Sequence, residues 1–405
     1  MRVLLVAGKG GVGKTTLAAA TALAASRDGD RTLLVSTDPA HSLTDVLGMT
    51  GTTGGTGEWR TAAEPVAVPA APGALDVLQI DTRARLDSAW PTVRRTIGGL
   101  LGAAGVDPLV AAEIAAVPGV DDILALLEVQ THASSYDVLV VDCAPTAETL
   151  RLLALPEALH GLVTRGFPID RRITRLLGPA GMADSTVEAL DALERLAGEL
   201  SDVRRLLTGT GAAVRLVTTP ERVVLAETQR ARTTLAMLGH HVDGVVVNRV
   251  AVGDGWPEEL SERHREALVA ARDRFADLPV RFAPYSGAEP VGVEALLGLA
   301  DDVLAGDDPL DLGATRTSTE ARTDGDRWFL DVSVPGADLD DLDISVTEDG
   351  DLVVDLGPHR RVIALPPVLR RCEVSGASLD RTDAGRVLRV HFDRDLAHWS
   401  TGTHS

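Results

Sequence analysis

A glycine-rich segment near the start of the chain places the strongest constraint on what it can fold into. Residues 8–15 fit the pattern GxxxxGK[ST], and they lie between a short apolar run and a helical pattern. In such a strand–loop–helix context, the glycines let backbone N–H groups converge on phosphate oxygens at a helix N-terminus. The segment therefore predicts a phosphate-binding loop. The nucleotide-binding residues expected there are Gly8, Lys9, Gly10, Gly11, Val12, Gly13, Lys14, Thr15 and Thr16.

Two side chains of this loop have expected contacts with ATP and Mg²⁺. Lys14 is expected to contact the β- and γ-phosphates, and the Thr15 hydroxyl to ligate the metal. Lys9 and Lys14 are also the only lysines among the 39 basic residues of the chain. A GC-rich coding bias explains why Arg replaces Lys elsewhere, but not why both lysines lie in one loop. We expect that the bulkier, forked guanidinium does not serve at these two positions.

The pattern along the first 304 residues indicates an α/β fold. Seven short apolar runs without alternation are typical of parallel strands that are covered on both faces. They are Val3–Val6, Leu33–Val35, Val77–Ile80, Val138–Val141, Val214–Val217, Gly244–Val247 and Val280–Phe282. Helical patterns lie between them, as in Thr15–Ser26, Glu188–Leu200 and Glu221–Leu238. We therefore predict a mostly parallel sheet with helices on both faces.

Other segments of the chain have a different character. Residues 83–133 and 150–210 are expected to be largely helical and to form a subdomain beside the sheet, whereas residues 50–73 are expected to be a loop. A polar, acidic linker is predicted over residues 305–326. Period-two patterns with turn signals then predict a small antiparallel β-sandwich over 327–395, followed by a frayed tail over 396–405.

Two carboxylates follow predicted strands directly. Asp38 comes after the Leu33–Val35 run and Asp142 after Val138–Val141, and the carboxyl ends of parallel strands face the ligand crevice of such a sheet. Asp38 is therefore a candidate to orient or deprotonate the attacking water. Asp142 is a candidate to hold a water bound to Mg²⁺, as Asp38 also is. His41 and Cys143 lie close by, but a surface or capping histidine and a small buried cysteine are the commoner cases.

The composition excludes several classes of protein. A net charge of −20 disfavours a general nucleic-acid binder and a protein held on an anionic membrane. The two cysteines, Cys143 and Cys372, form neither a disulfide scaffold nor a CxxC motif. No apolar run approaches the length of a membrane span, and the N-terminus lacks the features of a signal peptide. We therefore expect a cytoplasmic protein.

Three motifs together resemble the family of arsenite-pump-driving and tail-anchored-protein targeting ATPases, which carry a deviant Walker A loop. They are KGGVGKTT at 9–16, TDPAHSL at 37–43 and D-x-A-P-T-x-x-T-L-R-L at 142–152. Weaker agreements lie at 118–122, 219–221 with 227–228, 247–249, 284–285 and 289–292. The resemblance covers roughly residues 1–303, and the order of the motifs makes chance agreement remote.

The resemblance implies an ATP-dependent homodimer, or a pairing with a paralogous chain, that opens and closes with the nucleotide. Lys9 would then reach across the dimer to the partner's nucleotide, in the manner of an arginine finger. Asp38 would orient the attacking water, and Thr15 and Asp142 would help to bind the magnesium ion. Asn248 would contact adenine, and Pro284 would belong to the last loop on the nucleotide side.

The chain departs from the family in ways that bear on its cargo. Cys143 and the pair Ala147-Glu148 replace residues of the second switch. The zinc-binding CxxC of the targeting branch is absent, so a zinc clasp is excluded, and two cysteines cannot form a three-thiolate arsenite site in one chain. Only four methionines are present to line an apolar groove. Leucine and alanine stripes at 97–127 and 173–207 either line such a groove or pack as plain core.

Residues 327–395 resemble the α-crystallin-like domain of small heat-shock proteins. The alternation Phe329–Ala337, the run Asp351–Val354, the segment Arg360–Pro366 and the run Leu388–Phe392 carry this resemblance. Its edge strands could accept an extended peptide, or the domain could cap the ATPase and help it to dimerise.

Our hypothesis is therefore a Mg²⁺-dependent ATPase that works as a closing dimer and captures or delivers a protein client, meeting membranes only through a partner. Three alternatives stay open: a partition or positioning ATPase acting at DNA or a membrane, a subunit that drives arsenite or anion transport, and a module that binds ATP but barely hydrolyses it.

Overall fold

The structure of the chain is a computed structural model. It describes residues 1–38, 42–49, 64–80, 127, 129–143, 198–199, 201–313, 319–324, 327–337, 339–347, 350–357, 359–382 and 385–394. Several predictions lie outside these residues: His41, the motif at 118–122, residues 144–152 of the second switch, most of the helical subdomain and its stripes, and the tail at 396–405.

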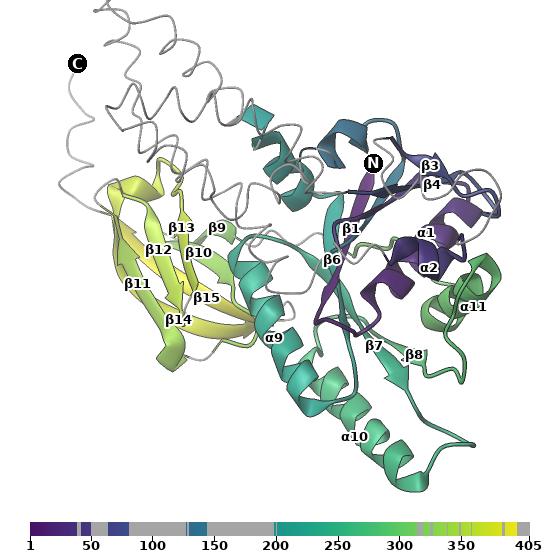
Figure 1. Cartoon of the computed structure of the whole chain (residues 1–405). Coiled ribbons are helices and arrows are strands. Elements are labelled where there is room, and N and C mark those ends of the chain that lie inside the picture. Colours follow the sequence, from purple (N-terminus) through teal and green to yellow (C-terminus); the bar gives the residue numbers. More distant parts are fainter. Residues whose placement is uncertain are drawn as a thin grey trace, which may run out of the picture.

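An eight-stranded sheet is the centre of the N-terminal part (Figure 1). In spatial order its strands are β3 (Val66–Ala67), β4 (Leu75–Gln79), β2 (Thr32–Ser36), β5 (Val138–Asp142), β1 (Arg2–Gly8), β6 (Ala212–Thr218), β7 (Val242–Val250) and β8 (Val280–Pro284). All neighbours pair in parallel except β3 and β4. Each of the seven predicted runs lies in one strand, so the predicted α/β class and parallel sheet are confirmed.

Helices cover both faces of this sheet. Helices α1 (Lys14–Arg27), α2 (Leu43–Leu47) and α11 (Val293–Leu304) share one apolar core. Helices α9 (Arg222–Met237) and α10 (Glu258–Arg274) share the other with the helical residues 129–133 and 201–208. Strand β1 serves both cores, because Leu4 and Val6 face one and Val3 and Leu5 face the other. No helix in the described part of the chain is long and apolar enough to cross a membrane.

The C-terminal part is a small β-sandwich, as the period-two pattern predicted. One sheet has the order β14 (Cys372–Thr382), β15 (Gly385–Arg394), β10 (Arg327–Ser333) and β9 (Thr319–Asp324), and the other β11 (Leu342–Val346), β12 (Leu352–Leu356) and β13 (His359–Ile363). Two 3₁₀ turns, Leu339–Asp341 and Leu369–Arg371, precede β11 and β14. Alternate side chains of β10 and β15 are buried between the sheets, among them Leu330, Val332, Val390 and Phe392.

Two segments predicted to be irregular contain strands. Strand β9 lies inside the predicted linker at 305–326 and pairs with β10 through its backbone. Its residues are mostly polar, so the sequence shows no apolar alternation that would predict a strand there. Strand β3 lies in the predicted loop at 50–73 and is only two residues long, too short to show a period. The first part of the linker is also packed, because Leu310 and Leu312 are buried in the core that α1 and α11 share.

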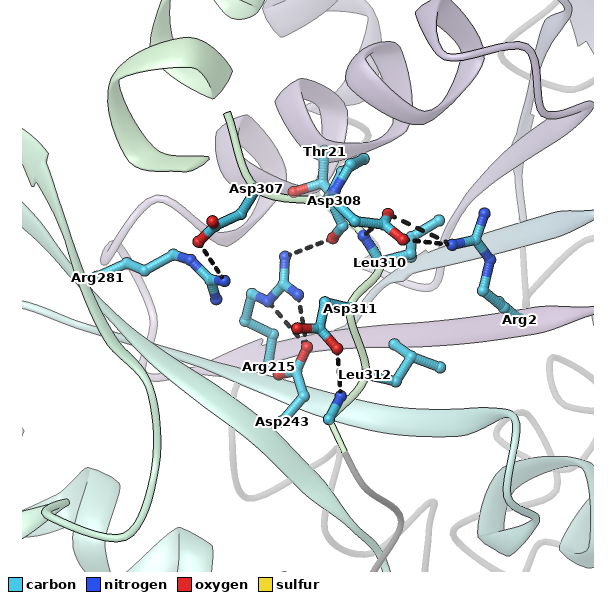
Figure 2. A network of polar contacts seen from close by, with 12 residues as sticks. Arg2, Thr21, Arg215, Asp243, Arg281, Asp307, Asp308, Leu310, Asp311 and Leu312 are labelled. Atoms are coloured by element: carbon cyan, nitrogen blue, oxygen red, sulfur yellow. Dashed lines mark hydrogen bonds and ion pairs between the residues drawn. The ribbon is translucent and has the colours of Figure 1, made fainter. Parts of the chain in front are cut away.

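A network of ion pairs fastens that first part of the linker to the amino-terminal edge of the sheet (Figure 2). At its centre Arg215 on β6 donates to Asp243 on β7 through Nη2, at 2.5 Å, and to the Pro309 carbonyl, at 3.0 Å. Both charged side chains are buried, with 4% and 0% of their surface exposed. A pair in this environment is held by its own hydrogen bonds, and loss of one partner leaves a buried charge without compensation.

The sandwich rests on helix α9. Thr233 donates to the Pro335 carbonyl at 2.5 Å, and Thr234 lies 3.0 Å from His359 Nε2. Arg361 of β13 donates to the Ala236 carbonyl at 3.2 Å, while Met237 joins the sandwich core. The last two turns of α9 therefore belong to the packing of both parts of the chain.

We predict that Asp243→Ala lowers the free energy of unfolding by about 3–5 kcal/mol, because Arg215 then stays buried without its partner. Urea denaturation followed by circular dichroism measures this change. A control in the same network is Asp307→Ala, which breaks the pair between Arg281 and the 63% exposed Asp307 and should lower the free energy of unfolding by at most about 1 kcal/mol. An equal loss of unfolding free energy in the two variants would contradict our conclusion that the buried Arg215–Asp243 pair is the more important of the two.

Candidate functional site

The carboxyl edge of the sheet gathers the residues that the sequence nominated. Strand β1 leads into the phosphate loop, residues 8–15, and β2 leads into Asp38. Asp142 ends β5, directly between them in the sheet order, and Asn248 and Pro284 lie at the ends of β7 and β8. One edge therefore carries every predicted site residue, as expected of a parallel sheet.

The backbone of the phosphate loop is shaped for an anion. Helix α1 begins at Lys14 after Gly13, whose φ of 96° is open to glycine but strained for other residues. The helix has no side-chain N-cap and no acidic residue in its first turn. Its first N–H groups therefore keep the partial positive charge that a phosphate would satisfy.

The two lysines of the loop lie in different surroundings. Lys14 is buried, 5% exposed, and its ammonium donates to the carbonyl of Lys9 at 3.3 Å, so the loop closes around it. Lys9 is 44% exposed along its side chain. Its ammonium lies 3.0 Å from Glu227 Oε2 on α9, in the same chain.

Asp142 is the most buried charged group of the site. It is 0% exposed, and desolvation is the main reason why its pKa rises from 3.8 to about 6. The Thr15 hydroxyl, the Lys14 ammonium and the Ser36 hydroxyl lower the pKa again, and Asp38 raises it. The carboxylate therefore lies among the groups that would surround a nucleotide's phosphates.

This arrangement fits a magnesium ion. Ser36 donates to Oδ2 of Asp142 at 3.1 Å, but Oδ1 is buried without a hydrogen-bond partner among the described residues. The Thr15 hydroxyl accepts from Ser42 at 3.3 Å, which keeps a second oxygen beside the carboxylate. Mg²⁺ prefers oxygen ligands and is commonly held by one carboxylate, a hydroxyl and phosphate oxygens. Thr15 and Asp142 are the residues that would hold it.

Asp38 is fixed by its backbone. Its N–H donates to Ser36 Oγ at 3.2 Å, and its carbonyl accepts from Gln79 Nε2 at 3.0 Å. The preceding residue, Thr37, donates its N–H to the carbonyl of Asp142 at 3.0 Å. The segment after β2 is thus held against the end of β5, which keeps the Asp38 carboxylate close enough to Asp142 to affect its pKa.

Asn248 makes a contact that the sequence did not predict. Its side-chain amide donates to the carbonyl of Val12 at 2.8 Å, and its Oδ1 accepts the N–H of Arg249 at 2.8 Å. A Cβ on Gly13 would lie 2.3 Å from the Asn248 amide nitrogen. Asn248 therefore supports the phosphate loop directly, while its contact with adenine stays a prediction. Pro284 is exposed at the end of β8.

Sequence reasoning gave no role to Ser36, Gln79 or Glu227 in this site. The first two end neighbouring strands, and the register pairs Ser36 with both Gln79 and Asp142. A signal was present, since Ser36 follows the apolar run Leu33–Val35 and Gln79 is the one polar residue of the run Val77–Ile80. Glu227 carries no such signal, because its nearness to Lys9 depends on how α9 packs after β6.

Two models of known protein families match the chain. A family model described as "Anion-transporting ATPase" matches residues 1–305, and one described as "HSP20-like domain found in ArsA" matches residues 325–392.

Relatives match over most of their length. "Protein Rv2184c" of Mycobacterium tuberculosis is 34% identical over 99% of this chain and 98% of its own. "Putative arsenical pump-driving ATPase" of Prosthecochloris vibrioformis is 32% identical over 97% of this chain and 96% of its own. "ATPase ASNA1 homolog 1" of Paramecium tetraurelia is 25% identical over 73% of this chain and 90% of its own.

We predict that Asp142→Asn stabilises the nucleotide-free protein above pH 6 and that the gain disappears toward pH 4. With its pKa raised from 3.8 to about 6, the folded wild type keeps a proton that the unfolded chain releases. Its stability therefore falls as the pH rises through this window, by roughly 1–3 kcal/mol. Thermal unfolding of both proteins between pH 4 and 8 measures the difference.

The exposed Asp273 of α10 provides a control, because Asp273→Asn should show no such pH-dependent gain. A constant difference between wild type and Asp142→Asn at all pH values would contradict the raised pKa.

Proposed function

Because the chain belongs to the anion-transporting ATPase family and is an ATPase, we propose that it hydrolyses ATP with Mg²⁺ as a homodimer that closes on its nucleotides. The observation that carries this proposal is the uncapped start of α1 beside the buried carboxylate of Asp142. The first is suited to the phosphates and the second to their metal.

Each residue has one task in the proposed reaction. The N–H groups of the phosphate loop and the Lys14 ammonium bind the β- and γ-phosphates. The Asp38 carboxylate orients the attacking water, and Lys9 of the second subunit places positive charge where the transition state accumulates negative charge. When bound, Mg²⁺ would neutralise charge on the phosphate oxygens, held by Thr15 and Asp142.

Exposed apolar side chains around the site support a partner on this face. Among the described residues, four of the seven large apolar side chains that are exposed follow the carboxyl ends of strands in this sheet. They are Val223, Val252, Tyr285 and Val291, with 69%, 38%, 46% and 46% of their surface exposed. A second copy that covered this edge would bury them together with the nucleotide.

For the output of the cycle we propose the capture or delivery of a protein client. Arsenite is a soft ligand that needs clustered thiolates, and the chain has only two cysteines. Cys143 follows β5 directly and is buried there, and Cys372 begins β14 in the sandwich. The HSP20-like sandwich supports a client instead, because its sheet edges offer backbone groups to an extended peptide.

We predict that Lys9→Ala lowers the rate of ATP hydrolysis by on the order of 10²–10³ and weakens ATP-dependent dimerisation. The reason is that the variant lacks the charge that each subunit contributes to its partner's transition state. Steady-state phosphate release and sedimentation velocity with ATP measure the two effects. Hydrolysis at the wild-type rate by a monomeric variant would overturn the trans-acting role of Lys9.

The client is tested with a trapped enzyme. Asp38→Asn should bind ATP and close but hydrolyse it slowly, so that a client bound in the closed state is retained on purification from cells. We expect polypeptides with apolar segments to be enriched over a Lys14→Ala control, and arsenite to leave the wild-type ATPase rate unchanged. Recovery of DNA would favour a partition ATPase, and activation by arsenite would favour anion transport.

A further inference from the structure

The Lys9–Glu227 contact joins two parts of the chain that differ in sequence position by more than two hundred residues. Glu227 lies in the second turn of α9, the helix that follows β6, and β6 is the neighbour of β1 in the sheet. Gly8 lies so close to β6 that a Cβ there would be 2.3 Å from the carbonyl oxygen of Val217. Close packing of β1 on β6 therefore brings α9 beside the phosphate loop.

This contact gives Lys9 a position within its own subunit. Lys14, the other lysine of the loop, is turned inward and bonded to the loop backbone. The ammonium of Lys9 is turned to α9 instead, where the carboxylate of Glu227 neutralises it. In the proposed dimer the same ammonium must act on the partner's nucleotide, and one Nζ cannot hold both positions.

We propose that Glu227 is a positioning residue for Lys9: it holds the Lys9 ammonium within its own subunit, and ATP-driven closure of the dimer must break that contact. The inference rests on the proposed function, because it concerns the trans-acting lysine of that reaction. Glu227 thereby favours the unpaired state in the absence of ATP, and the phosphates of the partner's nucleotide replace its carboxylate when the dimer closes.

The strength of the contact suits a reversible hold. Both side chains are partly exposed, 44% for Lys9 and 33% for Glu227, so water and salt weaken their attraction. Such a pair shifts an equilibrium by about two- to fivefold. Closure breaks one pair in each subunit, so the effect on dimerisation is squared, to roughly four- to twenty-five-fold.

The test is Glu227→Gln, which removes the charge and keeps the size of the side chain. We expect ATP-dependent dimerisation of the full chain at a roughly four- to twenty-five-fold lower dissociation constant, measured by sedimentation velocity with ATP under non-hydrolysing conditions. At saturating protein the hydrolysis rate should equal that of wild type, while half-maximal rate is reached at lower protein concentration. Raising the salt concentration should reduce the difference between the dissociation constants of Glu227→Gln and wild type, because salt screens the Lys9–Glu227 pair.

Two variants serve as controls. Glu262→Gln removes a similar exposed pair, with Arg265 on α10, and should leave dimerisation unchanged. In the Lys9→Ala background, Glu227→Gln should have no further effect, because the group that it holds is gone.

The outcomes separate this inference from the proposed function. Suppose that Lys9→Ala loses hydrolysis but Glu227→Gln dimerises as wild type does. The proposal that Glu227 holds Lys9 in its own subunit is then refuted, while the proposed action of Lys9 on the partner's nucleotide is retained. A Glu227→Gln protein that loses hydrolysis at saturating concentration would also refute it, since Glu227 would then aim Lys9 at the nucleotide. Failure of wild type to dimerise with ATP would refute the proposed function itself.

Discussion

The parallel register of strands β4, β2 and β5 is the constraint on which the site depends. It sets Gln79, Ser36 and Asp142 side by side where these strands end. The Ser36 hydroxyl then donates to Asp142 and accepts from the backbone N–H of Asp38. A slip of one residue in this register would point each of these side chains to the opposite face of the sheet. The precision of the site therefore depends on the register of strands whose buried residues are apolar except near their ends.

Helix α9 is the second element on which distant parts depend. Its second turn contacts the phosphate loop through Glu227, and its last two turns carry the sandwich through Thr233, Thr234 and Met237. Both sets of contacts lie on one continuous helix of 16 residues. The network around Arg215 fastens the connecting segment at the opposite edge of the sheet. The contacts with α9 therefore connect the sandwich to the helix that also reaches the phosphate loop.

The sequence predicted what depends on local patterns. The phosphate loop, the seven central strands and the alternation in β10 and β15 follow from spacing and apolar periodicity, and the structure contains them all. Strand β9 could not be predicted, because a polar strand is stabilised by its backbone pairing with β10 rather than by its own side chains. The Asn248–Val12 and Lys9–Glu227 contacts could not be predicted from the sequence either, because both join residues far apart in sequence and depend on tertiary packing.

The scarcity of lysine in this chain acquires a physical meaning from these contacts. Arg occupies every other basic position, and our expectation is that a guanidinium does not serve at positions 9 and 14. At position 14 the side chain is buried, and its ammonium donates to the Lys9 carbonyl of its own loop. At position 9 size is no obstacle, because the side chain is partly exposed. There an arginine would bind the Glu227 carboxylate with two parallel hydrogen bonds, which are stronger and more directional than the contact of an ammonium. In the proposed cycle Lys9 leaves the Glu227 carboxylate for the partner's nucleotide, and a point charge such as an ammonium suits this exchange better than a guanidinium.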